Sequence, residues 1–176
     1  MTMSAKAQGY MESLFNGTYA QYSTSKGLLP YPNTALPQHI GKDVTQYYFS
    51  TRMLPIFTAL HSVWYRKEGD SFVKVVPHII NDMFSPISLA YWIMEDGYFD
   101  SYGRAKTILL CTECFTVVEC ELLQQVLLNM GITSTLKVRN STKGTYRIRI
   151  SKASMPLLRN LVAPHMHTDF MYKLGV

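Results

Sequence analysis

The residues best suited to chemistry form two charged groups in the second half of the chain. The first lies in STLKVRNSTKGTYRIRISK, residues 134–152, where turn residues from Asn140 to Gly144 separate two alternating stretches. This alternation predicts a β-hairpin with one apolar and one basic face, because successive strand side chains point to opposite sides. The expected apolar face consists of Leu136, Val138, Ile148 and Ile150, and the basic face of Lys137, Arg139, Arg147 and Arg149.

Four cations on one sheet face indicate a polyanionic partner. Like charges opposite one another destabilise a sheet, so a partner that neutralises them explains the pattern. Arginine and glutamine can also pair bidentately with the edges of guanine and adenine. The alternative is a solvated edge whose basic side chains prevent aggregation. Weaker candidates for the same contacts are Arg104, Lys106, Tyr47 and Gln46.

The second group is the acidic pair Glu95 and Asp96 at the end of a predicted helix, residues 86–96. Acids at a helix C-terminus face the negative end of the helix dipole, which costs about 0.3 to 1 kcal/mol each. A divalent cation such as Mg²⁺ would offset this cost, because hard carboxylate oxygens can hold it against a phosphate. The alternative is that these are exposed helix-end acids without a function.

Capping residues define the helices that position these groups. Helix 86–96 is predicted by the N-cap residue Ser85 and ends at Gly97. A second helix begins at Thr116, which forms a capping box with Glu119. Its expected buried face consists of Cys120, Leu123, Leu127 and Met130.

Two further helices are predicted at residues 52–66 and from Ser154 to Pro164, and both should pack beneath a sheet. The segments around them, residues 43–60 and 144–161, both read as a strand followed by a helix with a proline near its start. This repeat predicts two related units.

Each repeat is followed by a lysine, Lys74 in FVKVVP and Lys173 in MYKLG. We therefore expect two α/β units joined near residues 78–85, each a sheet with helices on one face.

Composition is consistent with a folded, basic chain. The 176 residues are 47% hydrophobic, which supplies enough apolar surface for a core, and the formal net charge is +5. The sequence contains no run of about 18 apolar residues, so no membrane span is predicted. The cysteines Cys111, Cys114 and Cys120 favour buried, reduced thiols over a zinc site, because no second pair of ligands accompanies them.

A family motif coincides with the acidic helix end. Residues 89–97, LAYWIMEDG, align residue for residue with the LAGLIDADG motif, and Asp96 takes the position of its last acid. The preceding Ser85 and Pro86 and the later MYKL, residues 171–174, also resemble the single-chain, two-motif branch of the LAGLIDADG homing endonucleases. Residues 85–176 thus resemble a complete second half of such a protein.

The resemblance implies an α+β fold of saddle shape, in which antiparallel sheets with helices packed on one face straddle DNA. It implies that Asp96 is a catalytic metal ligand, and that Lys173 and Lys74 lie near the scissile phosphates. By the same resemblance Ala90 contacts a partner motif helix, beside Tyr91, which stands where the motif name has glycine.

A first motif is not found, because residues 1–26 contain no apolar helix that ends in Asp-Gly. We therefore expect residues 1–84 to form a partial first half that lacks its motif helix. Three explanations remain open. A separate peptide supplies the helix, two chains pair through residues 86–97, or cleavage is lost while binding survives.

The expected function is that of a site-specific, Mg²⁺-dependent DNA endonuclease of the homing, intron-encoded type. The rival is a non-catalytic RNA-binding protein, either an intron maturase or a component of an organellar ribonucleoprotein, because a basic saddle suits either duplex. The expected partners are double-stranded DNA or structured RNA, and a second chain or copy. The resemblance places the protein in a mitochondrion or another organelle.

Overall fold

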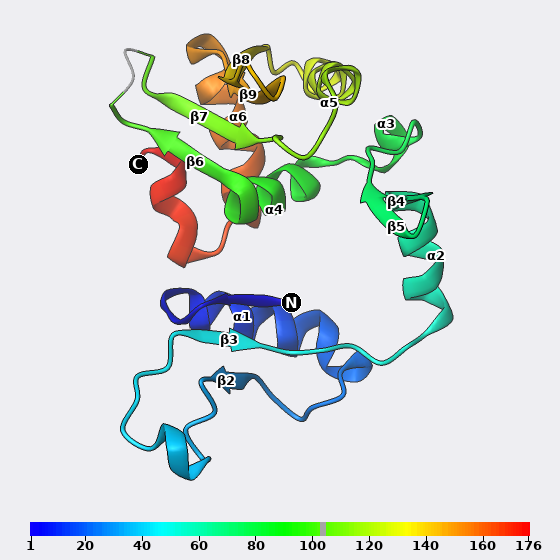
Figure 1. Cartoon of the computed structure of the whole chain (residues 1–176). Helices are drawn as coiled ribbons and strands as arrows, with labels where there is room; N and C mark the ends of the chain where they lie inside the picture. The colour runs from blue at the N-terminus through cyan, green and yellow to red at the C-terminus, as the bar shows by residue number, and fades with distance from the viewer. Residues whose placement is uncertain (103–104) are drawn as a thin grey trace. The chain divides into compact units, whose positions relative to one another are not determined.

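The computed structural model describes residues 1–102 and 105–176, and it divides into two compact units, Met1–Thr58 and Ala59–Val176. The elements follow one another along the chain as labelled in Figure 1. This division differs from the junction expected near residues 78–85. The reason is that Trp64, Val76 and Ile80 pack with the hydrophobic core of the second unit. The assignment of residues 1–84 to a partial first half stays a prediction.

The first unit is a small antiparallel sheet with a helix. Strands β1 (Thr2–Ser4), β2 (Leu29–Tyr31) and β3 (Gln46–Tyr48) pair in the order β1-β3-β2. Helix α1 (Gln8–Leu14) continues into a π-helical turn, Phe15–Tyr19. The buried core of this unit contains Met11, Phe15 and Phe49.

Helix α2 (Pro55–Trp64) leads into a hairpin, β4 (Tyr65–Glu68) and β5 (Ser71–Lys74), and then into the short helix α3 (Ile80–Met83). The prediction of a helix within residues 52–66 is confirmed. No residue of α2 is fully buried and Ile56 is 56% exposed, so the expectation that this helix packs beneath a sheet is wrong for most of its length and holds only at Trp64, which packs against the core of the second unit. Helical spacing creates an apolar stripe but does not specify what covers it.

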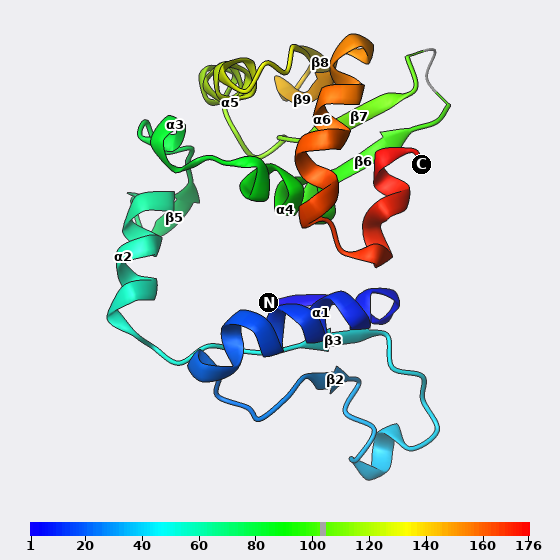
Figure 2. The ribbon, with the colours of Figure 1, turned by 180° about the vertical axis from the view of Figure 1, so that it is seen from behind.

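The second unit contains a four-stranded antiparallel sheet. Its strands β6 (Gly97–Asp100), β7 (Thr107–Cys111), β8 (Ser134–Asn140) and β9 (Thr145–Ile150) have the order β6-β7-β9-β8. Its helices are α4 (Pro86–Asp96), α5 (Val117–Asn129) and α6 (Met155–Val162), followed by a 3₁₀ segment, Thr168–Leu174. Helix α6 lies behind the sheet in Figure 1 and in front of it in Figure 2, so one sheet face is covered by helix. The predicted α+β class with antiparallel strands is confirmed.

The capping predictions are confirmed for both long helices of this unit. The Ser85 hydroxyl accepts from the N–H of Ser88 at the start of α4. Thr116 and Glu119 form the expected capping box at the start of α5. Cys120, Leu123 and Leu127 of α5 are buried.

The core of the unit lies between the sheet and these helices. Ile148 and Ile150 are at most 1% exposed, and Leu136 packs against the core. Val138 was expected beside them, but it is 57% exposed. Val138 keeps the regular register opposite Tyr146, but every residue of β8 from Lys137 onward is exposed, so the covered part of this strand face ends at Leu136.

The cysteines differ in exposure. Cys120 is buried, Cys111 is half-buried and Cys114 is exposed, so the expectation of uniformly buried thiols is wrong for Cys114. In the described part of the chain, no group of three or more metal-ligating side chains comes together. No helix in that part is long and apolar enough to cross a membrane.

Candidate nucleic-acid interface

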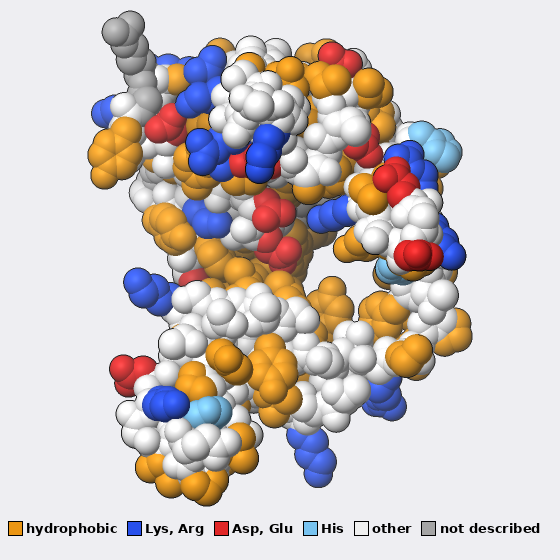
Figure 3. All heavy atoms as spheres, in the orientation of Figure 1, with side chains coloured by type: hydrophobic (Ala, Val, Ile, Leu, Met, Phe, Trp, Pro, Cys, Tyr) orange, Lys and Arg blue, Asp and Glu red, His pale blue; other side chains and the backbone are white. Residues whose placement is uncertain are grey.

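The sheet of the second unit carries its cations on the face opposite the core. Lys137 of β8 pairs with Arg147 of β9, and Arg149 lies between Thr135 and Leu109 of the neighbouring strands. Because Ile148 and Ile150 are buried on the other side, strand alternation directs Arg147 and Arg149 to this open face. Figure 3 shows blue Lys and Arg side chains with red acidic ones among them over this unit.

An acid that sequence reasoning missed organises the arginines on this face. Nε of Arg147 donates to Oε1 of Glu113 at 2.6 Å, and Nη2 of Arg147 forms an ion pair with the same oxygen. Nε of Arg139 lies 3.9 Å from this oxygen. Nη1 of Arg147 donates to the hydroxyl of Tyr98 at 2.9 Å. Glu113 therefore balances part of the positive charge on the predicted basic face.

Electrostatics keeps this pair ionised. Burial acts to raise the pKa of Glu113, but the hydrogen bond from Arg147 and the charges of Arg147 and Arg139 hold that pKa below its usual value. The hydrogen bond to Glu113 in turn raises the pKa of Arg147. Arg147 is thus a fixed, partly neutralised cation with a side chain only 20% exposed. Arg139 is 58% exposed and remains more accessible.

The acidic end of α4 is stabilised by a buried lysine. Nζ of Lys173 donates to the carbonyl oxygens of Ile93 at 3.3 Å and Met94 at 2.6 Å. These are among the last carbonyls of α4, where a cation opposes the helix dipole. Lys173 therefore provides the compensation that sequence reasoning assigned to a metal ion alone.

Burial of Lys173, which is 9% exposed, lowers the pKa of its ammonium group, while the charges of Asp96 and Glu95 raise it. Lys173 thus interacts electrostatically with both Asp96 and Glu95. Lys173 lies at the acidic helix end, and its predicted place near a scissile phosphate stays a prediction.

Asp96 is exposed at the end of α4 and offers hard oxygen atoms of the kind that Mg²⁺ prefers. It is accompanied by Glu95, which is also exposed. The described residues place no third metal-ligating side chain with them. The donors present therefore fit one side of a shared divalent-metal site and do not make up a complete one.

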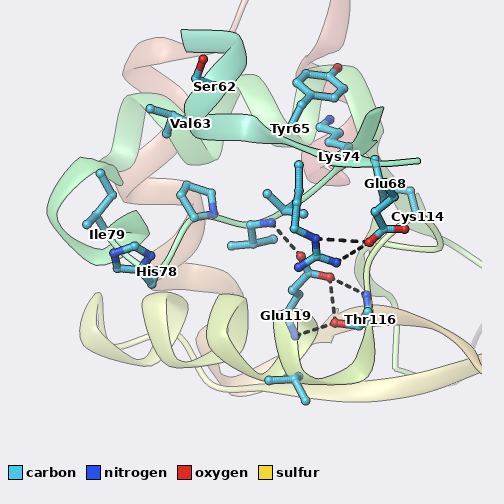
Figure 4. A pocket seen from close by; sticks show the side chains of 16 residues that line it. Ser62, Val63, Tyr65, Glu68, Lys74, His78, Ile79, Cys114, Thr116 and Glu119 are labelled. Carbon is cyan, nitrogen blue, oxygen red and sulfur yellow. Dashed lines mark hydrogen bonds and ion pairs between the residues drawn. The ribbon is translucent and has the colours of Figure 1, made fainter. Parts of the chain in front are cut away.

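Lys74 lies in β5, and its Nζ is 5.6 Å from the centroid of the Phe115 ring. The charges of both Lys74 and Asp96 act on the Cys114 thiol, whose pKa is raised mainly because neighbouring groups partly exclude water from it, although the residue is exposed. Lys74 also lines a cavity of about 880 Å³ between the β4–β5 hairpin and the start of α5. In Figure 4, the carboxylate of Glu119 projects into this region, where it accepts the N–H of Val76 at 2.9 Å.

Of the weaker groove candidates, Gln46 and Tyr47 lie in the first unit and Lys106 in the second, and their groove contacts stay a prediction. Gln46 and Tyr47 are adjacent in β3, so their side chains point to opposite faces, and only one can face a groove. Tyr47 pairs with Met3, which packs against the core of the first unit. Lys106 is exposed just before β7, and Arg104 lies outside the described residues.

Ala90 packs inside the second unit. It is 0% exposed and belongs to the same core cluster as Leu110 and Ile148. The outward side of α4 instead presents Ile87, which is 50% exposed, and Tyr91, which is 38% exposed. The expected contact of Ala90 with a partner helix stays a prediction. Its packing in the core of this unit is a separate role.

Replacing Ala90 with leucine should lower the free energy of unfolding by about 1 to 3 kcal/mol, because extra methylenes do not fit a filled core. Urea denaturation followed by circular dichroism measures this change. Ile87→Ala, at the exposed side of the same helix, should change stability by about 0.5 kcal/mol or less. Equal stability of Ala90→Leu and the native chain would contradict the packing assignment.

Comparisons with known proteins agree with this geometry. The model of the LAGLIDADG DNA endonuclease family matches residues 3–158. The chain is 33% identical to cytochrome b mRNA maturase bI2 of Saccharomyces cerevisiae over 84% of its own length, but it spans only 36% of that protein. It is 30% identical to intron-encoded endonuclease ai4 of Dictyostelium discoideum, and the match covers 77% of this chain and 80% of that protein.

A solved structure has the same fold. The homing endonuclease I-WcaI, bound to its DNA recognition sequence, superposes with a TM-score of 0.76. The match covers 98% of this chain and 74% of that chain at 24% sequence identity. The predicted LAGLIDADG-type fold is therefore confirmed.

Proposed function

Because the chain belongs to the LAGLIDADG DNA endonuclease family, we propose that it binds double-stranded DNA at a specific site and contributes Asp96 to phosphodiester cleavage. One observation carries this proposal. Helix α4 runs directly into the edge strand β6, so Asp96 lies at the edge of the sheet whose open face carries Lys137, Arg147 and Arg149. The cations that we propose bind phosphates and the acidic helix end thereby lie in one unit.

Mg²⁺ is the divalent ion that we propose for Asp96. When bound, such an ion neutralises charge on the phosphate and lowers the pKa of bound water. In this proposal Asp96 holds the ion, Lys173 keeps the end of α4 fixed, and the cations of the sheet hold the duplex. A second acid has to come from another motif helix, supplied by a further copy or by an additional peptide.

RNA binding is the second candidate function. The similarity to a cytochrome b mRNA maturase favours it, because that relative is named for action on an mRNA. Basic strands bind the phosphates of either duplex, so the same sheet face could serve RNA. The names of the relatives refer to cytochrome b mRNA and to introns, which supports our proposal of a mitochondrial location.

The sheet face can be tested by comparing Arg149→Ala with Arg147→Ala. Arg149→Ala should weaken duplex binding and reduce the slope of log Kd against log salt by roughly one, the value for one lost phosphate contact. Arg147→Ala should also weaken binding, but chiefly because Glu113 loses its principal partner and repels the phosphates. Fluorescence anisotropy with a labelled duplex at several salt concentrations measures both effects.

Glu113→Ala provides the matched control. Added to Arg147→Ala it should restore most of the lost affinity, because it removes the uncompensated acid. Added to Arg149→Ala it should leave the reduced salt slope in place. Unchanged binding in both arginine variants would remove this face from the interface.

A further inference from the structure

The β4–β5 hairpin presents a face on which aromatic and basic side chains alternate. In its register Tyr65 is opposite Lys74, and Lys67 is opposite Phe72. These four side chains share one face, because directly paired residues of an antiparallel hairpin point to the same side. Every residue of both strands is exposed, and Phe72 is 55% exposed.

A histidine from α2 extends this aromatic surface. The ring of His61 stacks on Tyr65 with a centroid distance of 4.6 Å and an interplanar angle of 6°. The same ring meets Phe72 edge to face at 4.7 Å and 76°. These contacts hold the rings in place, so that Phe72 offers a fixed apolar surface without being buried.

The acid of these two strands, Glu68, lies on the opposite face of the hairpin together with Arg66. Glu68 pairs with Ser71 on the other side, and it accepts from Nη2 of Arg66 at 2.6 Å. Figure 4 shows Tyr65 and Lys74 together on one side of the hairpin and Glu68 on the other. The aromatic face therefore carries Lys67 and Lys74 and no strand acid.

We propose that this aromatic and basic face binds single-stranded nucleic acid. Exposed rings stack on the faces of unpaired bases, and lysines beside them neutralise the backbone phosphates. A duplex hides its base faces by pairing and stacking, so this surface suits a single strand better than the duplex proposed for the sheet. A purely apolar protein partner would have to bury both lysines without a countercharge.

This site is distinct from the open face of the β6-β7-β9-β8 sheet and does not depend on the function proposed for it. The two faces belong to different sheets and carry different side chains. A chain with both sites would hold a duplex and a neighbouring unpaired strand at once, which is the arrangement that a structured RNA or an opened DNA offers.

The test measures binding of labelled oligouridine RNA and oligothymidine DNA, each about 10 nucleotides long, and of a labelled duplex. Phe72→Ala and Tyr65→Ala should each weaken single-strand binding by roughly 5- to 140-fold, the range for one lost stacking contact. Duplex affinity should stay unchanged in both variants. Tighter binding of oligouridine than of oligothymidine would identify RNA as the natural strand, and equal binding would identify single strands of either kind.

Val73→Ala is the matched control, because Val73 lies in the same strand on the opposite face and is 37% exposed. It should bind single strands as the native chain does, and Phe72→Trp should retain binding because it keeps a stacking ring. Lys67→Glu tests the face without removing a ring and should also weaken single-strand binding. Native affinity in Phe72→Ala, Tyr65→Ala and Lys67→Glu, or an equal loss in Val73→Ala, would overturn the proposal.

The two proposals fail in different ways. Arg149→Ala should weaken duplex binding and spare oligouridine binding, the reverse of Phe72→Ala. If Arg149→Ala leaves duplex binding unchanged while Phe72→Ala weakens oligouridine binding, the proposed duplex function is contradicted. If Phe72→Ala leaves oligouridine binding unchanged while Arg149→Ala weakens duplex binding, the hairpin site is contradicted.

Discussion

Residues 1–176 on their own should show no Mg²⁺-dependent double-strand cleavage of DNA that contains the insertion site of their gene. The chain offers too few carboxylate ligands, because metal-assisted displacement at a phosphate needs ligands from both sides of the metal site. In the described part of the chain, Asp96 and Glu95 are joined by no third metal-ligating side chain. Duplex binding should persist, since it depends on the cations of the sheet.

Cleavage should appear when a second motif helix is present, and Asp96→Asn should then reduce it by more than about 100-fold. Changes in residues that merely support metal ligands cost about 10- to 100-fold, so loss of a ligand itself should cost more. The measurement is a nicking assay on supercoiled plasmid at rising protein concentration. It is repeated with any in-frame sequence that precedes residue 1 in the gene.

Glu95→Gln is the control for this experiment, because it removes one charge from the neighbouring exposed acid and leaves the last acid of the motif intact. It should reduce cleavage far less than Asp96→Asn, and neither variant should weaken duplex binding. Efficient cleavage by the monomeric chain would contradict the requirement for a second helix. Equal cleavage by Asp96→Asn and the native sequence would contradict the role of Asp96.

Lys173→Met should lower the free energy of unfolding by about 1 to 3 kcal/mol, because it removes a hydrogen-bond donor from two buried carbonyl oxygens, one of which keeps the N–H of Gly97 as a second donor. These are the oxygens of Ile93 and Met94 at the end of α4. Methionine retains most of the apolar length of lysine, so the change isolates the ammonium group. Urea denaturation at neutral pH gives the size of the effect.

The pH dependence of stability identifies the same group. Burial lowers the pKa of Lys173 from its ordinary value of 10.5, so the folded chain releases this proton at a lower pH than the unfolded chain. Between the two pKa values the unfolded chain binds more protons, and the contribution of Lys173 to stability therefore rises with pH. The difference in stability between native chain and Lys173→Met should accordingly grow as pH approaches 10.5.

Lys143→Met controls for the loss of one positive charge, because Lys143 is exposed in the turn between β8 and β9. It should change stability by about 0.5 kcal/mol or less at every pH. A stability difference for Lys173→Met that stays constant with pH would contradict the lowered pKa.

The sequence by itself determined the features that depend on near neighbours. Ser85 and Gly97 set the bounds of α4, and Thr116 with Glu119 set the start of α5, because capping hydrogen bonds form between residues a few positions apart. The alternation in β9 likewise placed Arg147 and Arg149 opposite the buried Ile148 and Ile150, since strand geometry fixes the direction of successive side chains. The LAYWIMEDG segment then connected these elements to a family.

Tertiary structure alone decided which distant residues meet. Glu113 reaches Arg147 across 34 positions, and Lys173 reaches Ile93 across 80, and no local pattern encodes either pair. Burial also depended on packing, since Ala90 lies in the core whereas Ile56 and Leu60 of α2 are exposed. Periodicity shows on which face of a helix or strand a residue lies. Tertiary structure determines whether other elements cover that face and which charged side chains they place beside it.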